Sequence, residues 1–478
     1  MASEDKREEL HVLLVAFSAQ GHINPMLRLG KSLLTKGLHV TLATTELVYH
    51  RVFKPSTATD DDTVPTSITT NGIQVLFFSD GFGSSLKITS ADEYMELIGK
   101  LGPLSLSSAI KTHFLDTSKK LACIINNPFV PWVADVAASF KIPCACLWIQ
   151  PCALYAIYYR FYNNLDQFPT LQNPNMSVHL PGLPSLQPRD LPSFLLPSNP
   201  FGSFPKVLSE MFQHMKKLKW VLANSFHELE KEVIDSMANI CPIRTVGPLV
   251  PPSLLGQDQS EDIGIEMWKP QDSCMEWLDH QPRSSVIYIS FGSLIVLTAK
   301  QLESIASALK RSNRPFLWVI KPKEKDDILP LPQGFVEETK EQGMVVPWCP
   351  QTKVLVHPAI ACFMTHCGWN SMLEAITAGT PMIGYPQWTD QPTNAKLISD
   401  VFGLGIRLEQ DGEGFVGTEE VERAIEEMVV GPRAEEFRRK ASELKRAARE
   451  AVADCGSSER NIQSFVDEIV GTSDDNSK

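Results

Sequence analysis

The sequence predicts an α/β fold of two doubly wound halves that face each other across a cleft, and three observations support this prediction. A chain of 478 residues is too long for one ordinary hydrophobic core. Short runs of β-branched residues alternate with helical patterns, as a parallel sheet covered by helices requires. The alternation stops once, in a stretch rich in proline and glycine, and then restarts.

The first half opens with an apolar run that has the pattern of a buried strand, followed by a helical pattern. We expect strands at residues 11–17, 39–44, 73–79, 121–126 and 144–149, and a helix at 24–36. Residues 246–272 are polar, rich in Pro and Gly and without periodicity, which is typical of an interdomain linker.

The second half repeats the alternation. We expect strands at residues 286–290, 316–320, 344–347, 362–365 and 382–385, and helices at 300–310, 418–430, 434–453 and 458–470. Doubly wound sheets bind their ligands beyond the carboxyl ends of the strands. The functional residues should therefore follow these strands.

Composition excludes several classes of partner. The net charge is −12 and the pI is near 5.5, and no Lys/Arg cluster offers a basic face, so we expect no nucleic acid partner. No run of 18 apolar residues and no secretory leader is visible, so we expect no membrane span. The 10 cysteines have no paired spacing, which favours reduced thiols and a cytoplasmic location.

Several cofactor motifs are absent. A phosphate-binding P-loop ending at Gly30-Lys31-Ser32 would need a glycine at Pro25, and no GxGxxG opens the first helix. Asp60 and Asp62 lie in a polar stretch with no apolar residues on either side to order it. Such a stretch is more often a disordered loop than a metal site. We therefore expect neither a metal nor another bound cofactor.

Residues 348–391 carry the densest set of chemical groups. A strand runs into His366, Gly368 and then a helix whose start carries Asn370 and Ser371. A helix N-terminus offers free backbone N–H groups and a positive dipole end, which together bind anions. The Ser371 hydroxyl and a His366 ring N–H would add donors, so this sequence predicts a phosphate site.

Four further residues in the same stretch suit the other parts of a nucleotide sugar. Trp348 offers a flat face for a base, and Glu374, one turn into the helix, can accept from ribose hydroxyls. Asp390 and Gln391 follow the next strand and suit sugar hydroxyls. Each of these residues alone is more often structural, and their ordered combination is what points to a nucleotide sugar.

The ordered set resembles the C-terminal signature of plant family 1 UDP-sugar glycosyltransferases. The Gly21-His22 turn and the turn at residues 290–293 fall in the same order and spacing as in that family. The resemblance covers nearly the whole chain and implies the GT-B fold, in which two Rossmann-like domains face each other. It implies an acceptor-binding domain at 1–245, the linker at 246–272 and a UDP-sugar-binding domain at 273–457. The last segment, 458–478, would form a helix that crosses back onto the N-terminal domain, followed by a tail.

The resemblance implies UDP-glucose as co-substrate and assigns the donor site residue by residue. Trp348 would stack on uracil beside Gln351, and Glu374 would hold the ribose. Gln391 at the end of the signature favours glucose over galactose. The helix dipole and His366 would take the role of a metal. The full implied donor set is Ser293, Trp348, Cys349, Gln351, His366, Gly368, Trp369, Asn370, Ser371, Glu374, Asp390 and Gln391, with Ser293, His366, Asn370 and Ser371 around the diphosphate and Trp369, Asp390 and Gln391 at the sugar.

The same resemblance makes His22 the general base, although a histidine in this turn could also cap the helix. A neutral imidazole suits proton removal at cytosolic pH, and one in-line displacement would invert α to β. Family members usually carry an Asp that orients this base, and the aligned residue here is Asn127. An amide cannot neutralise an imidazolium, so the base should be weaker.

A weaker base favours an acceptor that arrives ionised, such as a small aromatic carboxylic acid. The segments 146–150, 183–185 and 189–192 resemble the subgroup that forms glucose esters of hydroxycinnamic, benzoic and indole-acetic type acids. Two alternatives stay open: an O- or C-glucosyltransferase of phenolics, and a catalytically silent nucleotide-sugar-binding protein. We expect a monomer.

Overall fold

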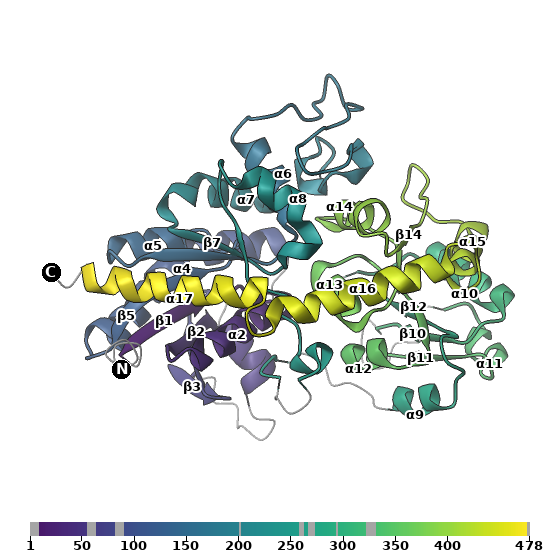
Figure 1. Ribbon diagram of the computed structural model, residues 1–478, viewed down its shortest axis with the longest axis horizontal. Helices are drawn as coiled ribbons and strands as arrows, with labels where there is room; N and C mark the ends of the chain where they lie inside the picture. The colour runs from purple at the N-terminus through teal and green to yellow at the C-terminus, as the bar shows by residue number, and fades with distance from the viewer. Residues whose placement is uncertain are drawn as a thin grey trace.

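The chain folds into two parallel sheets with helices on both faces, which lie side by side (Figure 1). The computed structural model describes residues 9–54, 64–81, 90–199, 202–257, 262–265, 273–292, 295–321 and 331–475. In this part of the chain, the N-terminal sheet has the order β3-β4-β2-β1-β5-β6-β7-β8, and the C-terminal sheet has the order β11-β10-β9-β12-β13-β14. The predicted α/β class is confirmed.

All neighbouring strands pair in parallel except β3 and β4, which pair antiparallel. The N-terminal strands are β1 (Leu10–Val15), β2 (His39–Thr45), β3 (Ser67–Thr70), β4 (Ile73–Phe78), β5 (Lys120–Asn126), β6 (Cys144–Trp148), β7 (Trp220–Ala223) and β8 (Arg244–Thr245). The C-terminal strands are β9 (Val286–Ser290), β10 (Phe316–Val319), β11 (Gly343–Val346), β12 (Ile360–Thr365), β13 (Met382–Gly384) and β14 (Gly405–Arg407). Central strands such as β6 and β9 are buried along their whole length, because helices cover both faces.

The helices follow the strands as crossover connections. In the N-terminal half they are α2 (Gln20–Thr35), α3 (Glu46–Val48), α4 (Ala91–Ile110), α5 (Val133–Ser139), α6 (Cys152–Tyr162), α7 (Ser203–Gln213) and α8 (His227–Met237). In the C-terminal half they are α9 (Ser273–Asp279), α10 (Ala299–Ser312), α11 (Phe335–Glu338), α12 (Gln351–Val356), α13 (Trp369–Ala378), α14 (Gln391–Lys396), α15 (Thr418–Val429) and α16 (Ala434–Val452). The last helix is α17 (Ser457–Asp475). No helix within the described ranges combines the length and the apolar character needed to cross a membrane.

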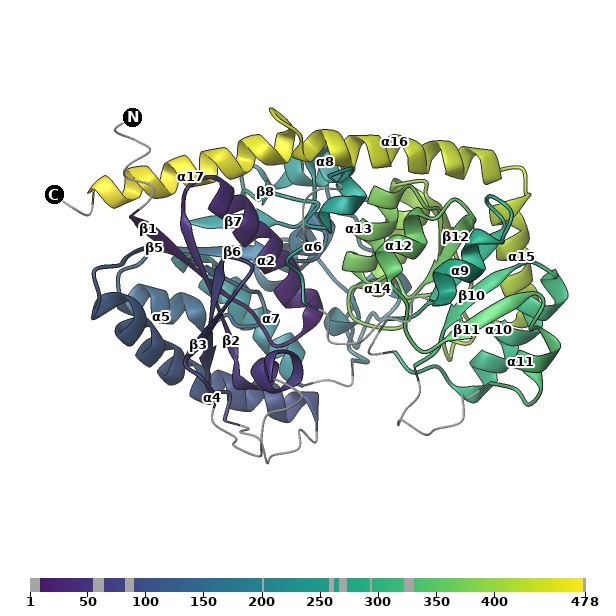
Figure 2. The ribbon, with the colours of Figure 1, turned by 90° about the horizontal axis from the view of Figure 1, so that it is seen from below.

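Helices α16 and α17 run along one side of both halves (Figure 2). α17 packs on the N-terminal half, where Phe465 is buried and its ring meets Trp220 edge-on at 5.2 Å. At the start of α17, the Ser458 hydroxyl donates to the carbonyl oxygen of Gly247. The end of the chain therefore crosses from the C-terminal half back onto the N-terminal half.

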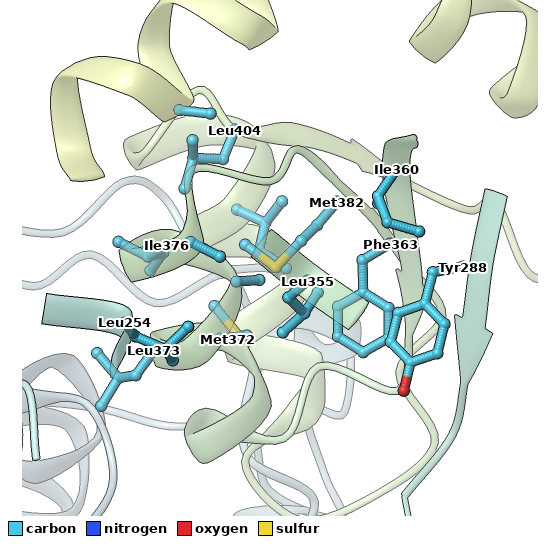
Figure 3. Close-up of a cluster of buried hydrophobic side chains, with 14 of the residues drawn as sticks. Leu254, Tyr288, Leu355, Ile360, Phe363, Met372, Leu373, Ile376, Met382 and Leu404 are labelled. Atoms are coloured by element: carbon cyan, nitrogen blue, oxygen red, sulfur yellow. The ribbon is translucent and has the colours of Figure 1, made fainter. Parts of the chain in front are cut away.

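The helix that carries the predicted phosphate site is anchored by a buried hydrophobic cluster (Figure 3). Met372 and Ile376 on α13 pack in this cluster with Met382 of β13. Phe363 of β12 stacks on Tyr288 of β9, with ring centroids 4.8 Å apart. Because these side chains are fully or almost fully buried, the start of α13 is held rigidly at the end of β12.

Candidate functional site

Two helix N-termini meet where the halves join. α2 begins at Gln20 shortly after β1, and α13 begins at Trp369 shortly after β12. Asn370 on α13 donates from Nδ2 to the carbonyl oxygen of Gly21 on α2 at 2.8 Å. Pro25 leaves this carbonyl available, because proline has no N–H to donate to the residue four positions earlier. This hydrogen bond therefore links α2, which carries the predicted base, to α13, whose N-terminus is the predicted diphosphate site.

His22 lies in the first turn of α2 and faces the residues that follow β5. Its Nδ1 is 2.9 Å from Oδ1 of Asn127. The same oxygen accepts from the backbone N–H of Phe129 at 3.1 Å, which fixes the amide with its oxygen toward the imidazole. Because an amide oxygen can only accept, Nδ1 carries the proton and Nε2 keeps its lone pair. A general base needs this tautomer.

Aromatic rings surround the predicted base. The His22 ring centroid lies 5.1 Å from that of Phe17 and 4.8 Å from that of Phe129. Burial lowers the pKa of His22 to about 4, and the hydrogen bond to Asn127 opposes this shift only in part. The imidazole is therefore neutral at pH 7 and can accept a proton, but it is a weak base.

His366 follows β12, and its ring is held between two glycines. A Cβ at Gly292 would lie 2.8 Å from the ring, and a Cβ at Gly368 would lie 2.4 Å from it. Burial lowers the pKa of His366 to about 4, so the ring is neutral. Its Nδ1 is buried without a hydrogen-bond partner in the part of the chain that the structure describes. A hydrogen bond to the backbone of Ser290 acts to raise the pKa of the ring, against the effect of burial.

A hydrogen-bonded network holds the predicted ribose-binding carboxylate. Gln351 at the start of α12 donates from Nε2 to Oγ of Ser371 at 3.0 Å and to Oε2 of Glu374 at 2.8 Å. Its Oε1 accepts from the hydroxyl of Tyr288 at 3.0 Å. Burial raises the pKa of Glu374, whereas Gln351 and Arg28 act to lower it. Ser371 and Glu374 therefore share one face of α13, three residues apart.

Asp390 and Gln391 stand at the start of α14, and both are buried. Asp390 accepts from Nδ2 of Asn394 at 2.8 Å and from the hydroxyl of Thr389 at 2.6 Å. Burial raises the pKa of Asp390, against the effect of these bonds. Oε1 of Gln391 accepts from the backbone N–H of Gln387 at 2.9 Å. This orientation leaves Nε2 of Gln391 as the group that can donate to a sugar hydroxyl.

The remaining predicted donor residues are placed differently. Trp369 is buried, and its Nε1 donates to the carbonyl oxygen of Asn224 at 2.8 Å, so its side chain joins the two halves and only its backbone is left for a sugar contact. Cys349 is buried in the hydrophobic core, which likewise leaves only its backbone. Trp348 is half-buried after β11. Ser293 lies outside the described residues.

Sequence reasoning did not single out Phe17 or Phe129, whose rings enclose His22. A signal was present for Phe129, because it follows the predicted partner of the base, Asn127, by only two residues. Phe129 also lines a cavity of about 330 Å³ between α4 and α7, together with Trp132. One aromatic side chain therefore contacts both the base and an open space on the N-terminal half.

Comparisons with known proteins agree with this geometry. Residues 206–447 match the family described as UDP-glucoronosyl and UDP-glucosyl transferase. UDP-glycosyltransferase 84B1 of Arabidopsis thaliana is 46% identical and is matched over 97% of this chain and 98% of its own length. The gallate 1-beta-glucosyltransferase of Quercus robur is 42% identical over 96% of this chain and 90% of its own length.

Among solved structures, that of Os79 from O. sativa in complex with UDP superimposes with a TM-score of 0.85. It is 32% identical, and the match covers 96% of this chain and all of Os79. Agreement over both halves confirms the predicted GT-B fold, and the sequence matches confirm an enzyme that uses a UDP-sugar. The chain belongs to the UDP-glucoronosyl and UDP-glucosyl transferase family and resembles its plant members in both domains.

Proposed function

We propose that this enzyme transfers glucose from UDP-glucose to the carboxylate of a small aromatic acid and forms a 1-O-β-glucose ester. The observation that carries the acceptor assignment is the amide of Asn127 at Nδ1 of His22, where a carboxylate would give a stronger base. A carboxylic acid with a pKa of about 4 arrives ionised at neutral pH, whereas a phenol with a pKa of about 10 must lose a proton. The similarity to gallate 1-beta-glucosyltransferases supports the same acceptor class.

On the donor side, the N-terminus of α13 would bind the diphosphate with backbone N–H groups, the Ser371 hydroxyl and His366. Trp348 would stack on uracil, and Glu374 would accept from the ribose hydroxyls. Ser293, which lies outside the described residues, stays a predicted contact of the diphosphate. These donors stabilise the negative charge that develops on UDP as it leaves.

In the transfer step, an acceptor oxygen attacks the anomeric carbon from the face opposite UDP. The bond from that carbon to the β-phosphate oxygen breaks, UDP leaves with the electron pair, and the configuration inverts from α to β. A carboxylate brings its own electron pair and needs no deprotonation. With a phenol, Nε2 of His22 would take the proton, so one site serves both acceptor types at different rates.

The acceptor would lie on the N-terminal half, beside the aromatic rings that enclose His22. Phe17 and Phe129 offer apolar faces to an aromatic ring. The cavity of about 330 Å³ that Phe129 lines offers space for an acceptor larger than a single ring.

A panel of aromatic acids and phenols, offered with UDP-glucose and analysed by mass spectrometry, tests this proposal. Acids should be the preferred acceptors, and their products should release the acid in mild alkali. A product that survives acid hydrolysis would be a C-glucoside and would contradict the proposal. UDP release that no acceptor accelerates would show a silent binding protein instead.

Activity should be independent of divalent metal ions. The positive dipole end at the α13 N-terminus supplies the field that a metal gives in other nucleotide-sugar enzymes, and His366 adds a neutral ring as a hydrogen-bonding group. Turnover after extensive dialysis against EDTA should match that of the untreated enzyme. Loss of turnover with recovery on adding magnesium or manganese would contradict this expectation.

Gln391→His should reduce the preference for UDP-glucose over UDP-galactose. The two sugars differ in the orientation of one hydroxyl, and a buried amide that donates to that hydroxyl can discriminate between them. We expect the ratio of kcat/KM for the two donors to fall about tenfold or more. Gln387→His, on the same loop, is a matched control that should leave the ratio unchanged. An unaltered ratio in Gln391→His would remove the sugar role from this residue.

A further inference from the structure

The Arg189-Asp190-Leu191-Pro192 motif connects the two halves. Its first residues form the 3₁₀ turn η3 (Pro188–Asp190) of the N-terminal half. Arg407 on β14 donates from Nη1 to Oδ1 of Asp190 at 2.6 Å and from Nη2 to the carbonyl oxygen of Arg189 at 2.8 Å. Only 3% of the Asp190 side chain and 12% of the Arg407 side chain are exposed. We call this buried pair the Asp190–Arg407 clasp.

Residues next to the clasp form hydrogen bonds with both ends of the segment 389–393. The hydroxyl of Thr393 donates to the carbonyl oxygen of Asp190 at 2.6 Å. At the other end, the Ser193 N–H donates to the carbonyl oxygen of Thr389 at 2.9 Å, and the Thr389 N–H donates to Oγ of Ser193 at 2.8 Å. Residues 190–193 of the N-terminal half therefore hold the start of α14 through hydrogen bonds on both sides.

The residue that precedes this segment is packed by aromatic rings of the N-terminal half. Phe194, in the 3₁₀ turn η4 (Ser193–Leu195), stacks on Phe204 with centroids 5.4 Å apart. Both rings meet Trp388 edge-on, at 6.3 Å and 6.4 Å. Phe204 in turn contacts Phe129, the ring beside His22, at 6.0 Å. Packed side chains therefore lead from the base to the loop before α14.

Asp390 and Gln391, the residues predicted to contact the sugar, lie between these two hydrogen-bonded ends. Gln391 is hydrogen-bonded to Gln387 and Asp390 is hydrogen-bonded to Asn394, so the side chains of this segment are fixed relative to one another. A shift of about 1 Å at a reacting centre is enough to cost about a hundredfold in rate. Contacts that fix this segment against the N-terminal half thus fix the sugar relative to the acceptor.

We propose that the Asp190–Arg407 clasp is a positioning device for donor-sugar recognition, supplied by the acceptor half of the molecule. It holds the start of α14 so that Nε2 of Gln391 meets the sugar while the anomeric carbon faces His22. This proposal rests on the sugar role of Gln391 in the proposed function. The predicted UDP contacts centre on α12 and α13, so UDP binding is expected not to depend on the clasp.

The test compares variants of the clasp with a matched exposed pair. Arg407→Met and Asp190→Asn remove the buried ion pair and keep most of its volume. Glu409→Gln breaks the neighbouring pair between Arg189 and Glu409, whose side chains are 63% and 62% exposed, so it should change little. Titration calorimetry gives the affinity of each full-length protein for UDP and for UDP-glucose in the absence of acceptor.

In both clasp variants we expect the affinity for UDP-glucose to fall at least about fivefold, while the affinity for UDP changes less than about twofold. The ratio of kcat/KM for UDP-glucose to that for UDP-galactose should fall as well. Glu409→Gln should match the wild type in both measurements. Because the binding assay needs no acceptor, it tests the clasp even if the acceptor proves not to be an acid.

Wild-type affinities and donor preference in both clasp variants, with only a lower melting temperature, would overturn the proposal and make the clasp purely structural. An equal loss of UDP and UDP-glucose affinity would also overturn it, because the clasp would then act on the whole donor domain. If Arg407→Met does not fold, Asp190→Asn provides the same comparison with a smaller change of shape.

Discussion

His22→Ala is expected to lower the turnover of a phenol, which must lose its proton, by about 10²–10⁴-fold while UDP binds with unchanged affinity. Because Asn127 fixes the proton of the His22 ring on Nδ1, Nε2 carries the lone pair that can take a proton from the acceptor substrate. The predicted nucleotide contacts lie on α12 and α13, in the other half of the molecule. Steady-state kinetics with a phenol and with an aromatic acid, together with calorimetric titration of UDP, measure both effects.

The pH dependence gives a second measure of the same base. Because burial lowers the pKa of His22 to about 4, the wild-type imidazole stays neutral as the pH falls from 7 to about 5. The base should be lost only as the pH falls through about 4, so kcat/KM for a phenol should hold above that value. His179→Ala, at an exposed histidine of the same half, is the control and should behave like wild type. Normal turnover of phenols by His22→Ala would contradict the assignment of His22 as the base.

Asn127→Asp is expected to shift the acceptor preference toward phenols. Oδ1 of Asn127 accepts from His22 and from Phe129, and an aspartate can keep both bonds. The new negative charge would stabilise the imidazolium and raise the pKa of His22 by about 1–3 units. This gain matters for a phenol, which must lose a proton, and little for an acid that is already ionised. We expect the ratio of kcat/KM for a phenol to that for a matched acid to rise about tenfold or more.

Two observations separate this effect from a general disturbance. The acid limb of the pH profile should move to higher pH in Asn127→Asp, in the direction of the raised pKa of His22. Asn127→Ala removes the hydrogen-bond acceptor of His22 without adding charge, so the ratio of phenol turnover to acid turnover should not rise. A ratio that falls or stays level in Asn127→Asp would show that residue 127 does not set the acceptor, and the assignment would rest on similarity to relatives alone.

All ten strands predicted from the sequence are present in the structure, and four of the observed strands were not predicted. The strands β1, β2, β4, β5, β6, β9 and β12 lie within two residues of the predicted ranges at each end. The strands that were not predicted are β3, β7, β8 and β14, which have two to four residues and lie at or next to the edge of a sheet. The start of α2 was placed at Asn24, four residues late, because Gly21 and Pro25 are weak helix formers. Packing against the sheet extends the helix to Gln20, which puts His22 inside it.

The donor site was predictable because its residues are contiguous. A strand, a glycine and a helix start follow one another between β12 and α13, and this local order defines an anion site without knowledge of the rest of the fold. Burial was not predictable in the same way. The side chains of Trp369 and Cys349 lie in the same stretch, yet the structure places them in the core or between the halves. Whether a side chain faces a ligand or a neighbouring helix depends on packing partners outside the stretch.

By itself, the sequence determined the α/β alternation, the family, the predicted base and the order of the donor residues, since each depends on short-range periodicity or on a local motif. Only the tertiary structure decided how the two halves are joined at the site. The hydrogen bond from Asn370 to Gly21 spans 349 positions and the clasp from Arg407 to Asp190 spans 217. Partners so far apart share no local pattern, because their contact arises only when two separately folded sheets pack against each other.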